Sequence, residues 1–184
     1  MKLIDDIKSN FGKRKLKKLL ADLNRNVEVS NFTNAHSVGI IYNIKNPDYQ
    51  VFINKYVDYL REEIGFKTIT TLGYNQKKGH PHFLKIGIKY KFFSKNELDW
   101  RNFPKGVEVE NFCNEKFDIL IDLTRNFAVP LRYVLVKSKA KLKIGRYSEE
   151  NEKYYDFMVD VSEDTSVSEY IKQVNHFLNN VKPK

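Results

Sequence analysis

The stretch FDILIDLTRNFAVPLRYVLVKSKAKLKIGRY, residues 117–147, decides the fold class of this 184-residue chain. It opens at residues 117–123 with a short apolar run that is typical of a buried strand. A polar turn follows at residues 124–126, and a proline opens the helix that we expect at residues 130–138. Residues 141–144 then indicate a second short strand. The whole stretch is therefore a strand, a helix and a strand, which is the repeating unit of parallel sheets.

The same alternation is predicted on both sides of this stretch. Runs rich in β-branched residues indicate strands, and apolar residues three and four apart indicate helices. We expect strands at residues 38–42, 66–74 and 155–161, and helices at residues 47–64 and from Ser166 onward. Alternating elements of these lengths predict an α/β fold: a Rossmann-like three-layer sandwich with a mostly parallel sheet that leaves room for an antiparallel edge strand.

Residues 84–92 show the strictest alternation in the chain, with apolar side chains at one set of positions and mainly lysines at the other. A period of two predicts a strand with one exposed, positive face. The polar connection before it contains His80 and His82, which resemble half of a metal site, but no further ligands follow at a recognisable spacing. Residues 94–116 give no clear pattern.

The N-terminal residues 1–26 are predicted to form a basic amphipathic helical appendage to a single α/β domain at residues 27–184. Apolar residues of the appendage fall into two sets that point about 150° apart on a continuous helix, with Gly12 between them. The sets are Leu3, Ile4, Ile7 and Phe11, and Leu16, Leu19, Leu20 and Leu23. Either the helix breaks near Gly12, or one face packs on the domain while the other meets a partner.

The formal net charge of +9 is unevenly distributed along the chain. Basic residues dominate the first 25 residues, and every charged residue from 125 to 146 is basic. Such local positive fields indicate an anionic partner. Flexible cationic side chains suit phosphate backbones, so we expect non-catalytic binding of RNA or of a ribosomal surface. The predicted contact residues are Arg14, Lys17, Lys18, Lys137, Lys139, Lys141, Lys143 and Arg146.

Two other function classes remain open. Ligands of open α/β sheets bind beyond the carboxyl ends of the strands, where this chain has Asn43, Thr124, Arg125 and Asn126. These residues could serve an enzyme or sensor for a small phosphorylated ligand, either a nucleotide or a sugar phosphate. The glycine-rich fingerprints of dinucleotide-binding folds and P-loops are absent from the sequence. The third class is a protein–protein adaptor that uses the two-faced N-terminal helix.

No catalytic residue, metal or cofactor is predicted. Asp118 and Asp122 share one face of their strand but lie about 13 Å apart at standard strand rise, which is too far to share a proton. The sole cysteine, Cys113, is expected to be a buried, unreactive thiol in a reducing compartment. The charged N-terminus resembles neither a secretory signal nor a membrane-spanning helix, which predicts a cytoplasmic protein without integral membrane association.

From NFTNAHSVGIIYN, residues 31–43, through residues 117–147 to the last helix, the chain resembles an uncharacterised family of short basic bacterial proteins. Residues 117–147 are also similar to the N-terminal Rossmann-like half of heptosyltransferase-type glycosyltransferases. In those enzymes a strand ending in I-D-L leads to a helix and then to a short basic strand ending in I-G. This second resemblance implies a Rossmann-like fold. It does not imply glycosyl transfer, because the second domain that holds the nucleotide sugar has no counterpart here.

Overall fold

The computed structural model describes residues 2–21, 25–84, 87–162 and 165–182, with side chains of the first helix from Asn10 onward. Six strands of this described part form one sheet in the order β3-β2-β1-β4-β5-β6, and every neighbouring pair is parallel. The strands are β1 (Ser37–Asn43), β2 (Thr68–Asn75), β3 (Tyr90–Ser94), β4 (Ile119–Asp122), β5 (Leu142–Arg146) and β6 (Phe157–Val159).

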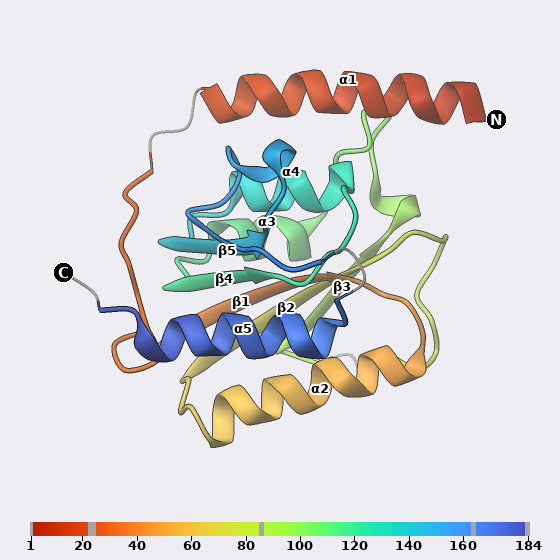
Figure 1. Cartoon of the computed structure of the whole chain (residues 1–184). Coiled ribbons are helices and arrows are strands. Elements are labelled where there is room, and N and C mark those ends of the chain that lie inside the picture. The colour runs from red at the N-terminus through yellow and green to blue at the C-terminus, as the bar shows by residue number, and fades with distance from the viewer. Residues whose placement is uncertain (1, 22–24, 85–86, 163–164, 183–184) are drawn as a thin grey trace.

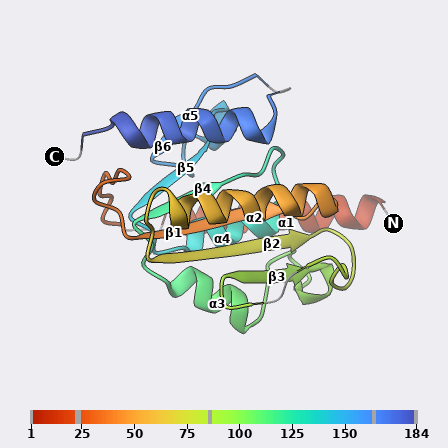
Figure 2. The ribbon, with the colours of Figure 1, turned by 90° about the horizontal axis from the view of Figure 1, so that it is seen from below.

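Helices cover both faces of the sheet, which makes the three layers of a Rossmann-like sandwich (Figure 1). The helices are α1 (Lys2–Ala21), α2 (Pro47–Glu62), α3 (Val107–Asn114), α4 (Val129–Lys137) and α5 (Val167–Asn180), with short 3₁₀ turns η1 (Lys95–Glu97) and η2 (Glu149–Asn151). Helices α2 and α5 lie on one face, whereas α3 and α4 lie on the other. Seen from the first face, α5 lies toward β5 and β6, and α2 lies nearer β1 and β2 (Figure 2). The predicted fold class is confirmed.

The buried residues form one apolar cluster on each side of the sheet because both faces are covered. Along β1, Ile40 and Tyr42 join the cluster under α2 and α5, and Ile41 joins the cluster under α4. In β4, Ile121 lies beside Ile40 and Leu120 belongs to the opposite cluster. This coverage explains why β1 and β4 have continuous apolar sequences rather than alternating ones.

The predicted strand at residues 84–92 is wrong over most of its length. Strand β3 begins only at Tyr90, which lies opposite Thr71 in the parallel register with β2. The amide of Tyr90 donates to the carbonyl of Gly87 at 3.1 Å, so the chain turns just before the strand, and Ile88 is 91% exposed. Residues 85–86 lie outside the described residues. The antiparallel edge strand is also absent from the described sheet, since β3 and β6 at its two edges both run parallel to their neighbours.

Helix α1 is continuous and does not break at Gly12. A Cβ at Gly12 would lie 2.7 Å from the carbonyl oxygen of Arg101 and 2.8 Å from a methyl carbon of Val129, so glycine permits this close approach to the first turn of α4. Leu16 is fully buried in the same apolar cluster as the residues of α4. Of the two predicted alternatives, the structure therefore favours a helix with one face packed on the domain. Of the other apolar set, Phe11 lies edge-on to Trp100, and the side chains of Leu3, Ile4 and Ile7 lie outside the described ones. Across the described residues, no helix is both long and apolar enough to span a membrane.

Candidate anion-binding site

The carboxyl ends of β1 and β4 lie at the point where the order of the sheet reverses. From β1 the chain crosses to β2 on one side, whereas β4 leads to β5 on the other, so the loops after these two strands diverge. Such a topological switch point is where ligands bind in open α/β sheets. A hollow of about 430 Å³, here called the switch-point hollow, lies at this position. It is lined by Asn43, Ile44, Lys45, Tyr49, Gln76, Leu123, Thr124, Arg125 and Asn126.

A second hollow of about 450 Å³, here called the outer hollow, adjoins the first toward β5 and β6. The two hollows share Arg125 and Asn126. The outer hollow is lined by Arg125, Asn126, Arg146, Tyr147, Ser148, Asn151, Val161 and Ser162. The two hollows are therefore neighbours along the carboxyl edge of the sheet, with Arg125 and Asn126 in the wall of both.

The ligand residues suggested by the sequence, Asn43, Thr124, Arg125 and Asn126, all line the switch-point hollow. Asn43 is the last residue of β1, and the other three follow β4. The side-chain oxygen of Asn43 is shielded from solvent and accepts no hydrogen bond in the described structure. A buried acceptor without a partner is costly, so this oxygen is available to a donor such as a ligand hydroxyl.

Sequence reasoning missed Lys45 as a site residue and assigned Arg146 to a different surface. Desolvation lowers the pKa of Lys45, and the positive charges of Arg125 and Arg146 lower it further. The three cations are therefore close enough to repel one another. Lys45 lies only two residues beyond the end of β1, which is the signal that could have identified it. Arg146 could not be placed without the strand order.

Arg146 is a buried cation, only 8% exposed, and its pKa is lowered chiefly by that burial. Its guanidinium lies 4.3 Å from the ring centre of Tyr170, and Nη2 donates to the carbonyls of Thr165 at 3.3 Å and Ser166 at 3.5 Å. Nε has no hydrogen-bond partner, and no carboxylate among the described residues forms an ion pair with Arg146. The wall of the outer hollow thus contains a positive charge that the backbone carbonyls and the Tyr170 ring hold in place.

A buried polar network supports this edge of the sheet from within. Asp122, at 1% exposed, accepts hydrogen bonds from the Tyr155 hydroxyl at 2.6 Å and from the Thr124 amide at 2.7 Å. Its carboxylate lies 3.5 Å from Nη1 of Arg132, and Nη2 of Arg132 donates to Asn151 at 2.7 Å. Burial raises the pKa of Asp122, and Arg132 opposes that rise. The network fixes the turn after β4, and the Asp122 carboxylate is occupied by these partners.

Asp118 serves a different purpose at the opposite end of β4. Its carboxylate accepts hydrogen bonds from the amides of His36 at 2.9 Å and Ser37 at 3.0 Å. Despite its desolvation, these bonds and the contact with Lys141 lower the pKa of Asp118. The two aspartates therefore have separate structural partners at the two ends of their strand.

Two of the eight basic residues predicted to bind nucleic acid, Lys143 and Arg146, are not on the exposed surface that the prediction requires. Arg14, Lys17 and Lys18 are exposed on α1, and Lys137 and Lys139 are exposed at and just beyond the end of α4. Lys141 forms ion pairs with Glu28 at 3.0 Å and with Asp118 at 3.4 Å. Arg146 lines the outer hollow instead.

The prediction that Lys143 contacts nucleic acid is wrong. It is only 1% exposed, and its Nζ donates to the carbonyl of Leu135 in α4 at 2.5 Å. Burial lowers the pKa of Lys143 to about 7. Alternating lysines form an exposed row of charges only on a strand that has one face in contact with solvent. Here β5 lies between β4 and β6 and is covered by α4, so Lys143 cannot contact a partner in this conformation.

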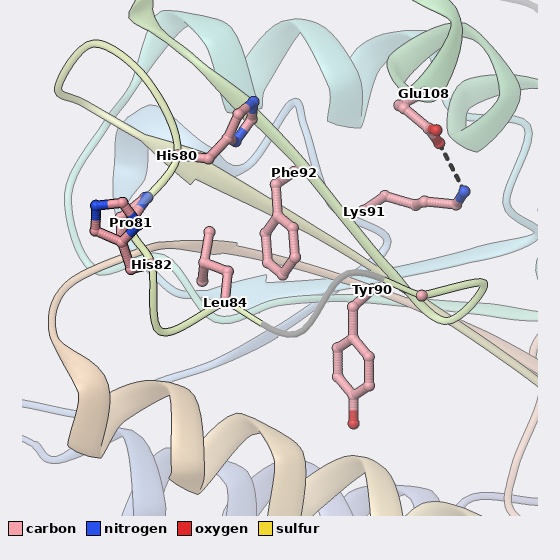
Figure 3. Close-up of a pocket in the computed structure, with 9 residues that line it drawn as sticks. His80, Pro81, His82, Leu84, Tyr90, Lys91, Phe92 and Glu108 are labelled. Carbon is pink, nitrogen blue, oxygen red and sulfur yellow. Dashed lines mark ion pairs between the residues drawn. The ribbon is translucent and has the colours of Figure 1, made fainter.

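Another hollow, of about 390 Å³, lies beside β3 and contains the two histidines noted in the sequence (Figure 3). His80 and His82 come from the connection after β2, and Lys91 forms an ion pair with Glu108 at 2.9 Å. No group of three His, Cys, Asp or Glu residues in the described ranges is placed to hold a metal ion. Cys113 is buried as predicted, and desolvation raises the pKa of its thiol to about 12.

The chain belongs to a family of unknown function, DUF6913, whose model matches residues 8–181. This confirms the resemblance to an uncharacterised family. Comparison with curated proteins and with solved structures found no match. The similarity to glycosyltransferases therefore has no support beyond the sequence of residues 117–147.

Proposed function

We propose that this protein binds a small phosphorylated ligand, a nucleotide or a sugar phosphate, at the carboxyl edge of its sheet. The observation that carries the proposal is the gathering of Lys45, Arg125 and Arg146 around the two neighbouring hollows at the switch point. Three cations that repel one another are stabilised by an anion placed between them. A phosphate group supplies both the negative charge and several strong acceptors.

The neutral residues of the site fit the same class of ligand. Asn126 offers an amide beside the cations, and the shielded oxygen of Asn43 offers an acceptor for a sugar hydroxyl, whereas the Thr124 side chain is hydrogen-bonded to Asp122. Asp122, the nearby carboxylate, is neutralised by Arg132 beneath the surface, so it opposes an incoming anion less than a free carboxylate would. These features support an anionic ligand that also carries hydroxyl groups.

The first prediction tests this site with inorganic pyrophosphate, ribose 5-phosphate and ATP. We expect at least one of these probes to raise the melting temperature and to bind with measurable heat in calorimetry. Lys45→Ala or Arg125→Ala should weaken that binding about tenfold, because each removes one charge-assisted contact worth about 1.5 kcal/mol.

Lys67→Ala is the matched control, because Lys67 is an exposed lysine just before β2, at the opposite edge of the sheet. It should leave the affinity unchanged. The proposal fails if none of the probes binds, or if Lys67→Ala weakens binding as much as Lys45→Ala does.

RNA, including a ribosomal RNA surface, is a second candidate partner. It is favoured by the exposed basic residues Arg14, Lys17 and Lys18 on α1 together with Lys137 and Lys139 near the end of α4. Helix α1 packs on α4 through Leu16, so both groups belong to the same face of the sandwich (Figure 1). A salt-sensitive contact with phosphates is the binding mode that such exposed cations support.

For RNA, the triple variant Arg14→Glu, Lys17→Glu and Lys18→Glu should weaken binding of a single-stranded oligonucleotide. If all three residues contact phosphates, the slope of log affinity against log salt should fall in magnitude by about 2. The charge-matched control replaces Lys55, Lys67 and Lys172, three exposed lysines elsewhere on the domain, by glutamate. Equal losses in both triple variants would mean that net charge alone attracts the RNA.

A further inference from the structure

We infer that the ligand is a nucleoside di- or triphosphate, with its phosphates along the row Lys45, Arg125 and Arg146 and its base against Tyr147 in the outer hollow. This inference rests on the proposed function and specifies its ligand. A single phosphate group would need only one of the two hollows. The structure instead has two neighbouring hollows of similar volume, both lined by Arg125 and Asn126.

The arrangement of the cations indicates how the phosphate chain of the ligand is oriented in the two hollows. Lys45 lines only the switch-point hollow, Arg146 lines only the outer hollow, and Arg125 lines both. The positive charge therefore runs from one hollow into the other rather than being confined to one point. A chain of two or three phosphates has the corresponding distribution of negative charge, whereas a sugar monophosphate has not.

Tyr147 is an aromatic residue in the lining of the outer hollow. The residue is 44% exposed, although its amide donates to the carbonyl of Val159 at 2.9 Å and so holds its backbone in place. A large, partly exposed aromatic side chain directly after a buried arginine is the combination that stacks on a base next to a phosphate. A sugar phosphate has no π surface and would gain little from this ring.

Among the other residues that line the outer hollow, some side chains are held by hydrogen bonds within the protein and others can bond to a ligand. Asn151 is fixed, because its amide nitrogen donates to the Arg146 carbonyl at 2.9 Å and its oxygen accepts from Arg132. Ser148 and Ser162 carry hydroxyls that can bond to the polar edge of a base, and the Ser162 hydroxyl shares a hydrogen bond of 2.9 Å with that of Thr165. Arg146, the member of the phosphate row that lines only the outer hollow, lies in the same wall as these hydroxyls.

The experiment compares the four ribonucleoside triphosphates with inorganic tripolyphosphate by calorimetry. We expect at least one nucleotide to bind about tenfold more tightly than tripolyphosphate. Tyr147→Ala should remove that advantage and leave the affinity for tripolyphosphate unchanged, whereas Tyr147→Phe should keep it. Lys45→Ala should weaken binding of both kinds of probe.

The outcomes separate this inference from the proposed function. If tripolyphosphate binds and no nucleotide binds more tightly, or if Tyr147→Ala affects both probes equally, the inference is wrong and phosphate binding stands. If no probe binds at all, both are wrong. Circular dichroism and the melting temperature of each variant show whether a loss of binding is a loss of folding. Because Tyr147 is partly exposed, we expect Tyr147→Ala to remain folded.

Discussion

Replacing Arg132 by leucine is expected to lower the free energy of unfolding by about 3–5 kcal/mol, because it leaves the buried carboxylate of Asp122 without its counter-ion. Arg132 is 4% exposed, and its guanidinium also contacts the hydroxyl of Tyr155 and lies 5.3 Å from the ring centre of Tyr154. Leucine fills part of the volume but replaces none of these polar contacts. Urea denaturation followed by circular dichroism measures the loss.

The loss should also depend on pH. Burial places the pKa of Asp122 above its value in the unfolded chain, so the folded state binds the additional proton between these two values. Stability from this group therefore falls as pH rises through that window and stays low above it. Without Arg132 the pKa of Asp122 rises further. The difference between the variant and the original protein should thus be larger at pH 8 than at pH 5.

The double variant Arg132→Leu and Asp122→Asn is the informative control. It removes the stranded charge, so it should recover a substantial part of the stability that Arg132→Leu loses. Arg61→Leu, which breaks an exposed ion pair with Asp58, should have little effect. A loss below about 1 kcal/mol for Arg132→Leu, or no recovery in the double variant, would contradict a structural role for the buried pair.

The elements that the sequence predicted correctly are those whose pattern reflects burial on both faces. Strands β1 and β4 are continuous apolar runs because helices cover them on each side. The strand at residues 84–92 was predicted wrongly because a period of two shows which side chains share a face, not whether a neighbouring strand is present. The partner available at that edge, β2, pairs only from Thr71 onward.

The candidate site was predictable where it depends on strand ends and unpredictable where it depends on strand order. Asn43 and Arg125 could be brought together from the sequence, since the carboxyl ends of parallel strands meet at one edge. Arg146 could be assigned to the site only once β5 was known to lie beside β4. Lys143 was misplaced for a related reason, since nothing in its alternating neighbours reveals that α4 covers that face of β5.

Replacing Lys143 by methionine is expected to stabilise the protein by about 2–4 kcal/mol near pH 6, because the buried ammonium costs more than its contacts return. A pKa lowered from 10.5 to about 7 corresponds to a burial cost of about 5 kcal/mol for the charged form at 1.36 kcal/mol per unit. Methionine has a similar length and no charge. It leaves the carbonyl of Leu135 without the ammonium as donor, which offsets about 1–3 kcal/mol of the gain.

The pH dependence distinguishes relief of this charge from a general packing effect. Between pH 7 and about 10.5 the unfolded chain binds the lysine proton and the folded protein does not, so stability from this group rises with pH. The advantage of Lys143→Met should therefore be greatest below pH 7 and should shrink by pH 9 in thermal or urea denaturation. Lys141→Met, which replaces a partly exposed lysine paired with Glu28 and Asp118, should produce no such gain. A Lys143→Met protein that is less stable at both pH values would show instead that the ammonium is required to hold β5 against α4.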